Sequence, residues 1–105
     1  MTAVTFFTDN GSITGFYITG HSTVDEKDIE GKLVCSAVSS AVYLTVNTIT
    51  EIVGAGADIN VTDGEMKIKL LDKISESQEI LKGFKLHITE LMKQYQNRIK
   101  VVSEV

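Results

Sequence analysis

Two segments in which apolar and polar residues alternate begin the chain, at residues 4–8 and 13–19. Both are rich in β-branched and aromatic side chains, which favour β-strands. Asn10 and Gly11 lie between them, and an Asn-Gly pair tolerates the positive φ angles of a tight hairpin turn. The pattern therefore predicts an N-terminal β-hairpin.

The same alternation returns in the second half of the chain, at residues 58–62 and 65–71. Asp63 and Gly64 separate these two segments and supply the residue types of a two-residue turn. A weaker alternation over residues 98–102 is compatible with a last strand. A second hairpin and a C-terminal strand are therefore expected.

A helix is predicted over residues 33–53, where apolar residues recur at a spacing of three to four. Its apolar arc is wide, which is typical of a helix in the centre of a domain. Small residues crowd its first half and allow close approach of another group: Ser36, Ala37, Ser39, Ser40 and Ala41. Gly54 and Gly56 follow it and are expected to end it.

A second helix is predicted to begin near Ser75 and to end near Gln96. Ser75 and Gln78 have the spacing of a capping box, in which the two side chains satisfy free backbone N–H groups at a helix start. Apolar residues from Leu81 to Tyr95 then fall on one face, and most charged residues fall away from it.

The predicted order is β-β-α-β-β-α-β. Hairpins combined with two helices indicate an α+β fold, with an antiparallel or mixed sheet and both helices packed on it. The chain has 105 residues and shows no linker or repeat, so residues 1–105 are expected to form a single domain. Residues 22–32 are charged, lack helical periodicity and are predicted to be a long loop.

Composition narrows the classes of function. The net charge of −4 argues against direct nucleic-acid binding, which needs clustered Lys and Arg. The single cysteine cannot form an internal disulfide, and no signal peptide is apparent at the N-terminus. Serine and threonine interrupt the apolar run at residues 33–46, which is too short and too polar for a membrane span. A cytoplasmic protein without membrane contact is expected.

Cys35, the only cysteine, is the first candidate for chemistry. A lone cytosolic cysteine is most often a small buried apolar residue. Here the predicted helix boundary places it in a first helical turn, where free N–H groups favour a thiolate. The N–H groups of Cys35 and Ser36 would then point at an oxyanion formed beside the sulfur.

His21 follows the second predicted strand, at the other end of the charged loop. A lone histidine there is most often a surface or structural residue. A loop from a strand end to a helix start can nevertheless bring it near Cys35, and a thiol needs an imidazole to accept its proton. One Cys and one nearby His are too few for a zinc site, and no dinucleotide or phosphate motif is present. No metal and no cofactor are expected.

Taken together, Gly20-His21 and the run Val34-Cys35-Ser36-Ala37-Val38-Ser39 resemble the bacterial ribosomal-processing cysteine proteases. The resemblance extends over essentially the whole chain. It implies an α+β fold, a homodimer, and a cysteine–histidine dyad with His21 as base and Cys35 as nucleophile. It also implies a substrate: the precursor of one large-subunit ribosomal protein (number twenty-seven), from which the family removes an N-terminal extension.

The resemblance further makes Ser39 a supporting residue, one helical turn after Cys35, beside the Ser36 already considered for the oxyanion. One position departs from the family, which commonly has Asp where this chain has Lys32. If that acid orients the histidine, either another acid, with Asp28 and Glu30 as the candidates, replaces it here, or this chain is a weaker enzyme. Two other classes stay open: a peptide-binding module without catalysis, and a structural dimer.

Overall fold

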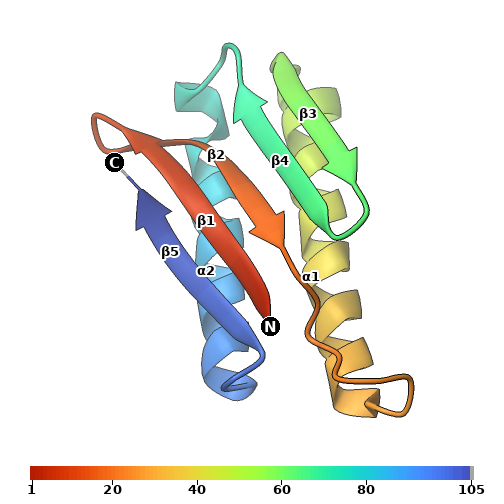
Figure 1. The fold of residues 1–105 in the computed structure, drawn as a ribbon. Coiled ribbons are helices and arrows are strands. Elements are labelled where there is room, and N and C mark those ends of the chain that lie inside the picture. Colours follow the sequence, from red (N-terminus) through yellow and green to blue (C-terminus); the bar gives the residue numbers. More distant parts are fainter. Residues whose placement is uncertain (105) are drawn as a thin grey trace.

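Five strands form one mixed β-sheet in the order β3-β4-β2-β1-β5 (Figure 1). The computed structural model describes residues 1–104. The strands are β1 (Thr2–Asp9), β2 (Ser12–Thr19), β3 (Ala57–Thr62), β4 (Glu65–Leu70) and β5 (Ile99–Glu104). Strand β5 pairs with β1 in parallel, and the other neighbours are antiparallel. The predicted order of elements, the mixed sheet and the α+β class are confirmed.

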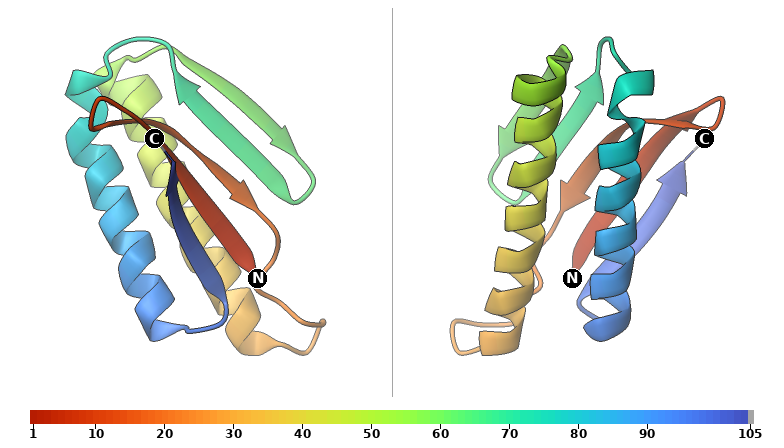
Figure 2. Two further views of the ribbon diagram at one scale, coloured as in Figure 1. Left: turned by 60° about the vertical axis from the view of Figure 1, so that its left-hand side comes forward. Right: turned by 180° about the vertical axis from the view of Figure 1, so that it is seen from behind.

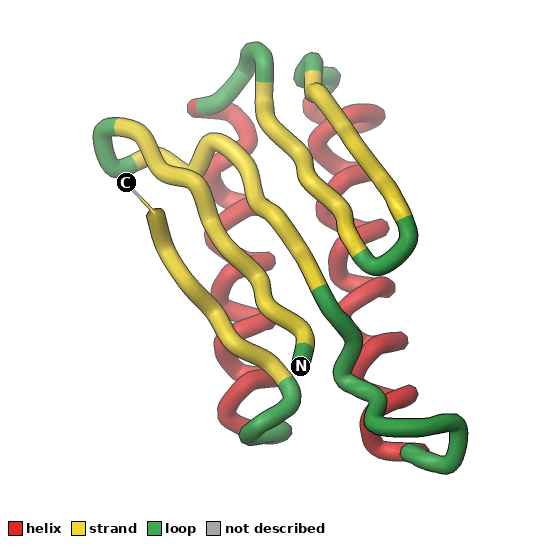
Figure 3. Tube along the Cα trace, viewed as in Figure 1, coloured by secondary structure: helices red, strands yellow, loops and turns green. Residues whose placement is uncertain are grey.

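Two helices cover one face of this sheet and lie side by side (Figure 2). They are α1 (Ile29–Asn47), which continues as the π-helical segment η1 (Thr48–Val53), and α2 (Gln78–Gln94), which follows the short 3-10 turn η2 (Ser75–Ser77). Within residues 1–104 the other face of the sheet carries no helix. The chain is thus a two-layer α+β domain, and loops connect its layers only at the ends (Figure 3).

An aromatic cluster anchors α2 to the sheet. The ring of Phe84 lies 4.7 Å from that of Phe16 and 5.7 Å from that of Phe6, measured between centroids. All three side chains are buried. Full burial of each such side chain contributes about 1.5–3 kcal/mol to stability. The aromatic cluster therefore stabilises the packing of α2 on the sheet.

Helix α1 begins at Ile29, so the predicted start at residue 33 is wrong. The side chain of Asp28 caps it by accepting the N–H of Gly31. The first turn is exposed and charged, so it carries no apolar periodicity that a sequence pattern would detect. Cys35 therefore lies beyond the first turn, and the predicted loop ends at Asp28.

The predicted capping box at the start of the second helix is also wrong. Gln78 directs its side chain to β2, where Nε2 donates to the Ile13 carbonyl at 2.8 Å and Oε1 accepts the Ile13 N–H at 2.8 Å. Ser77 takes the N-cap position without a side-chain capping bond. The glutamine thus fastens α2 to a strand instead of closing its own helix end.

The helix from Ile29 to Val53 is long and apolar enough to cross a membrane by length and composition. It extends well beyond the apolar run at residues 33–46 on which the sequence argument was based. Its inner face nevertheless belongs to the core, where Val34, Val38 and Ile49 are buried against the sheet. One such helix is weak support for a membrane span, because the core helix of a globular fold has the same length and composition.

Candidate active site

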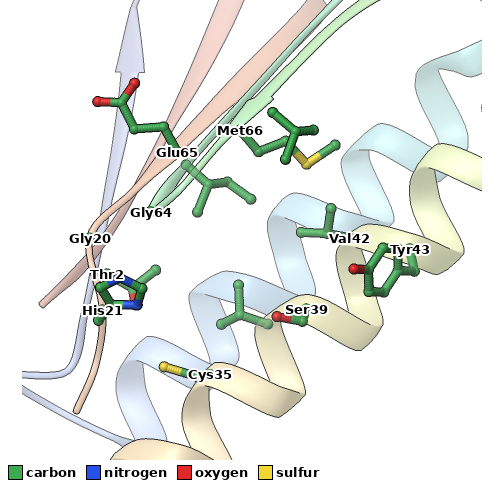
Figure 4. Close-up of a pocket in the computed structure, with 13 residues that line it drawn as sticks. Thr2, Gly20, His21, Cys35, Ser39, Val42, Tyr43, Gly64, Glu65 and Met66 are labelled. Atoms are coloured by element: carbon green, nitrogen blue, oxygen red, sulfur yellow. The ribbon is translucent and has the colours of Figure 1, made fainter.

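A cleft of about 270 Å³ opens between α1 and the ends of β2 and β4. His21, just after β2, lines one wall and Cys35 on α1 lines the other (Figure 4). The remaining lining residues are mostly apolar or small: Thr2, Ile18, Gly20, Val38, Ser39, Val42, Tyr43, Val61, Gly64, Glu65 and Met66. The fold therefore brings together the two residues that the sequence singled out.

The thiol of Cys35 is half-buried and has a main-chain donor. The N–H of Ser22 donates to Sγ at 3.4 Å. A hydrogen bond donated to sulfur favours the negatively charged thiolate, which is the nucleophilic form of cysteine. The donor beside the Cys35 sulfur is thus an amide of the preceding segment.

Ser22 is itself held firmly, with only 3% of its surface exposed. Its hydroxyl lies 2.7 Å from the hydroxyl of Thr2 and donates to the Arg98 carbonyl at 2.9 Å. Thr2 begins β1 and Arg98 immediately precedes β5. The two ends of the chain therefore meet under the segment that faces Cys35.

Arg98 joins this segment to the start of α1. Its guanidinium donates to the Ser22 carbonyl at 2.6 Å and forms a two-pronged ion pair with Asp28, with Nη2 to Oδ1 at 2.9 Å. The hydrogen bonds from Arg98, then those from the N–H groups of Val24 and Gly31, hold the pKa of Asp28 well below its usual range. Asp28 is therefore a charged cap of the helix that carries Cys35.

The Gly-His step is set by backbone geometry. Gly20 has a φ of +83°, and a Cβ there would lie 2.3 Å from the Met1 carbonyl oxygen. Its N–H donates to the Gly64 carbonyl at 3.0 Å, which ties the end of β2 to the β3–β4 turn. Only glycine tolerates both conditions, so Gly20 aims the next residue, His21, into the cleft.

His21 is exposed, in contrast to Cys35. A Cβ on Gly64 would lie 3.4 Å from His21 Nε2, so the imidazole rests against the β3–β4 turn. Within residues 1–104 neither ring nitrogen makes a hydrogen bond, and none joins His21 to Cys35. The two residues share the cleft without a hydrogen bond between them among the described residues.

No carboxylate orients His21 in the described part of the chain. Asp28 binds Arg98, and the Glu30 carboxylate lies 3.5 Å from the Arg98 Nε. Both acids considered as replacements for the family aspartate are therefore engaged by Arg98 instead of by His21. Glu65 lines the cleft. Burial, and then the hydrogen bond and the negative charge of Glu65, raise the pKa of Tyr17.

The two serines predicted to support catalysis occupy different places. Ser39 lines the cleft one turn after Cys35, whereas Ser36 is exposed and lies outside it. The proposed oxyanion donors are a second correction: the N–H groups of Cys35 and Ser36 lie inside α1, where they bond the carbonyls four residues earlier. Among residues 1–104 no group of three or more metal-ligating side chains occurs.

Comparisons with known proteins bear directly on this site. The family model described as cysteine protease Prp matches residues 1–100. The chain belongs to the Prp cysteine protease family. The resemblance read from Gly20-His21 and the motif around Cys35 is therefore confirmed, and this Prp family member is a cysteine protease.

Solved structures agree over the whole length of the Prp fold. A ribosomal processing protease Prp from Staphylococcus aureus, in complex with a covalently linked product peptide, is 25% identical, with a TM-score of 0.86 over 99% of this chain and 100% of that one. A Streptococcus mutans protein, SMU.848, is 26% identical with a TM-score of 0.79, covering 99% and 96%. A comparison with curated protein sequences finds no significant match.

The residues that the sequence analysis missed lie in the cleft lining, as Thr2 does, or behind it, as Ser22 and Arg98 do. Ser22, Arg98 and Thr2 carry no motif, and Arg98 is 70 residues from its partner Asp28. A capping acid at Asp28 was detectable in principle, because Asp is one of the residue types preferred at the N-cap of a helix. Nothing in the local pattern pointed to Arg98.

Proposed function

We propose that this protease removes the N-terminal extension of a ribosomal-protein precursor, with the large-subunit protein number twenty-seven as substrate. The observation that carries the proposal is the match to the Staphylococcus aureus ribosomal processing protease over the whole chain, with a TM-score of 0.86. That protein holds a covalently linked product peptide. The cleft of the present chain presents a thiol and an imidazole in one cavity.

In the proposed reaction Cys35 is the nucleophile and His21 the general acid–base. The Cys35 thiolate attacks the scissile carbonyl carbon, and a new C–S bond forms as the peptide C–N bond breaks. His21 accepts the thiol proton and gives it to the departing amine. Water then attacks the acyl-enzyme, with His21 as base, and releases the second product and the free thiol.

The shape of the cleft suits an extended peptide with apolar side chains beside the scissile bond. Ile18, Val42, Val61 and Met66 form most of its floor and walls beyond Cys35. Each apolar side chain fully buried there contributes about 1.5–3 kcal/mol. The backbone of the substrate is expected to lie beside His21 and Cys35.

The test is cleavage of the full precursor by Cys35→Ala, with Ser40→Ala as the matched control. Ser40 lies on the same helix, is exposed and does not line the cleft. We expect Cys35→Ala to abolish cleavage with an unchanged circular dichroism spectrum, and Ser40→Ala to cleave as the wild type does. Cleavage retained by Cys35→Ala would contradict the proposal.

We also propose that the protease works as a cytoplasmic homodimer. The outer side of α1 carries three large apolar residues that are exposed in the single chain: Ile29 (72%), Leu33 (59%) and Leu44 (65%). Their spacing returns to nearly the same side of a helix with 3.6 residues per turn. Apolar surface left in water is unfavourable, and a second copy would remove it from water.

Light scattering on the purified chain tests this dimer. We expect the molar mass of two chains for the wild type, and of one chain for a double Leu33→Glu and Leu44→Glu variant. Leu71→Glu is the control, because Leu71 is equally exposed but follows β4. A monomeric wild type would contradict the dimer, and co-flotation with lipid vesicles would assign the apolar helix to a membrane instead.

A further inference from the structure

The segment between β2 and α1 is tied at both ends to one side chain. Arg98 donates to the carbonyl of Ser22, where the segment begins, and pairs with the carboxylate of Asp28, where it ends. The side chains of Arg98 and Asp28 are 21% and 10% exposed, so water screens the pair only partly. The Ser22 carbonyl and the Asp28 carboxylate therefore both bind Arg98, a residue far away in the sequence.

Both ends of this segment affect the surroundings of Cys35. At the first end, the N–H of Ser22 is aimed at Sγ at 3.4 Å. At the second end, Asp28 caps the helix on which Cys35 stands. Gly31 brings the two together, because a Cβ there would lie 2.7 Å from the Ser22 carbonyl oxygen. The helix and the segment thus approach as closely as their backbones allow.

We propose that Arg98 is a positioning residue for the nucleophile: through Asp28 and the Ser22 carbonyl it holds the Ser22 N–H on the Cys35 sulfur. Arg98 touches neither the cleft nor the sulfur, so it acts only through these two residues. The proposal rests on the proposed function for the reaction that the thiolate performs. The position of the donor itself does not depend on the substrate.

The reason that an arginine serves here is geometric. A planar guanidinium offers several donors in a fixed fork, and it binds a carboxylate through two parallel bonds while a third reaches a carbonyl. Lysine would supply the charge from a single point and could not hold both groups in one orientation. The backbone of Ser22 gains a fixed place relative to α1 as a result.

Other charged or titratable groups surround the thiol and define its electrostatic setting. The groups that line the cleft with Cys35, or lie behind the Ser22 segment, come from four elements: His21, Tyr43, Glu65, Arg98 and Asp28. Removing the charge of Arg98 also leaves Asp28 as an unpaired negative charge. The test must therefore separate geometry from charge, which requires a variant that keeps the charge of Arg98.

Alkylation of Cys35 by iodoacetamide at about neutral pH measures the thiolate without any substrate. We expect Arg98→Lys, Arg98→Met and Asp28→Asn each to slow alkylation by about 3- to 10-fold, the range expected from loss of one hydrogen bond to the attacking sulfur. Lys93→Met, which breaks the exposed ion pair with Glu90 on α2, is the matched control and should leave the rate unchanged.

Amide hydrogen exchange at Ser22 separates positioning from general loss of stability. We expect the Ser22 N–H to exchange faster in Arg98→Lys than in the wild type, while core amides of β1 and β2 keep their protection. If Arg98→Met does not fold, Asp28→Asn carries the test, since the asparagine keeps one acceptor for the helix cap. Unchanged alkylation and unchanged Ser22 exchange in folded Arg98→Lys and Asp28→Asn would overturn the proposal.

Failure of the positioning role and failure of the proposed function give different results. If the wild type does not cut the ribosomal precursor but these variants slow alkylation, the substrate assignment fails and the positioning role stands. If the wild type cuts the precursor and the variants alkylate and cut at the wild-type rate, the positioning role fails alone. For a protease with the proposed substrate, the variants should lower kcat and leave KM unchanged, because Arg98 does not line the cleft.

Discussion

The two walls of the cleft are built in opposite ways. On one wall Cys35 is half-buried, with a donor on its sulfur and a chain of hydrogen bonds behind that donor. On the other wall His21 is exposed, and its ring makes no hydrogen bond within residues 1–104. The sulfur of Cys35 is therefore held by a main-chain donor, whereas no hydrogen bond of the described residues fixes the imidazole of His21.

The difference fits the tasks that the proposed mechanism gives to the two groups. A half-buried sulfur that must carry negative charge needs a fixed donor, because an unpaired charge away from water is unfavourable. An imidazole that moves a proton between the sulfur and the leaving amine has to serve two partners in turn. Catalytic hydrogen bonds are often long in free enzymes and tighten only when a substrate binds. Backbone geometry, through Gly20 and Gly64, restrains the histidine only loosely.

The His21→Ala variant is expected to have the largest effect and tests the contrast between the two walls of the cleft. We expect precursor cleavage to fall by about 10²- to 10⁴-fold, the usual contribution of a general acid–base. Alkylation of Cys35 should change far less, because the donor on the sulfur belongs to Ser22. His87→Ala, at the exposed histidine of α2, is the control. An equal loss of alkylation and cleavage in His21→Ala would mean that the histidine already contacts the sulfur in the free enzyme.

Gly20→Ala tests the backbone that presents the histidine. A positive φ at a residue with a side chain costs about 1–3 kcal/mol, and the new Cβ would also collide with the Met1 carbonyl. We expect a lower Tm and reduced cleavage. Gly83→Ala is the control, because its Cβ would meet nothing within 4 Å and alanine stabilises a helix by about 1 kcal/mol relative to glycine. A Gly20→Ala variant as stable and active as the wild type would show that this turn does not position His21.

The dependence of Tm on pH tests the ion pair behind the wall of the cleft that carries Cys35. The pKa of Asp28 lies well below its usual value of 3.8 because Arg98 and two backbone N–H groups bind the carboxylate. A depressed pKa means that the pair stabilises the fold above the unfolded-state value, and that this contribution is lost as pH falls toward the folded-state value. The Tm of the wild type should therefore drop more steeply below about pH 4 than that of Asp28→Asn. Parallel curves for the two proteins would contradict the pairing.

The smallest expected effect is at the turn beneath His21. Gly64→Ala and Gly11→Ala both place alanine at positive φ in a hairpin turn, at +77° and +80°. Both should lose about 1–2 kcal/mol of stability. Only at Gly64 would the Cβ approach His21 Nε2, at 3.4 Å. We expect a modest loss of cleavage in Gly64→Ala alone, measured at a temperature where both variants are folded. Equal activities would mean that the imidazole is not restrained by this turn.

Local patterns in the chain determined the order of the elements. Both hairpins, the second helix and the last strand could be predicted because alternation, Asn-Gly and Asp-Gly turns and helical periodicity are properties of neighbouring residues. The start of α1 could not, because its first turn is solvent-exposed and its cap, Asp28, is stabilised by a residue at the far end of the chain. The capping box failed for a related reason, since Gln78 bonds to Ile13 across the layers.

By itself the sequence determined the candidate pair, His21 and Cys35, and the α+β class in which they lie. Only the tertiary structure decided what surrounds them: Arg98 pairs with Asp28, Ser22 supplies the donor on the sulfur, and none of the described acids forms a hydrogen bond with the histidine. Sequence patterns report interactions between residues close along the chain, whereas these contacts join residues up to 76 positions apart. These residues become neighbours because the start of β1 and the residue before β5 pack beneath the segment between β2 and α1.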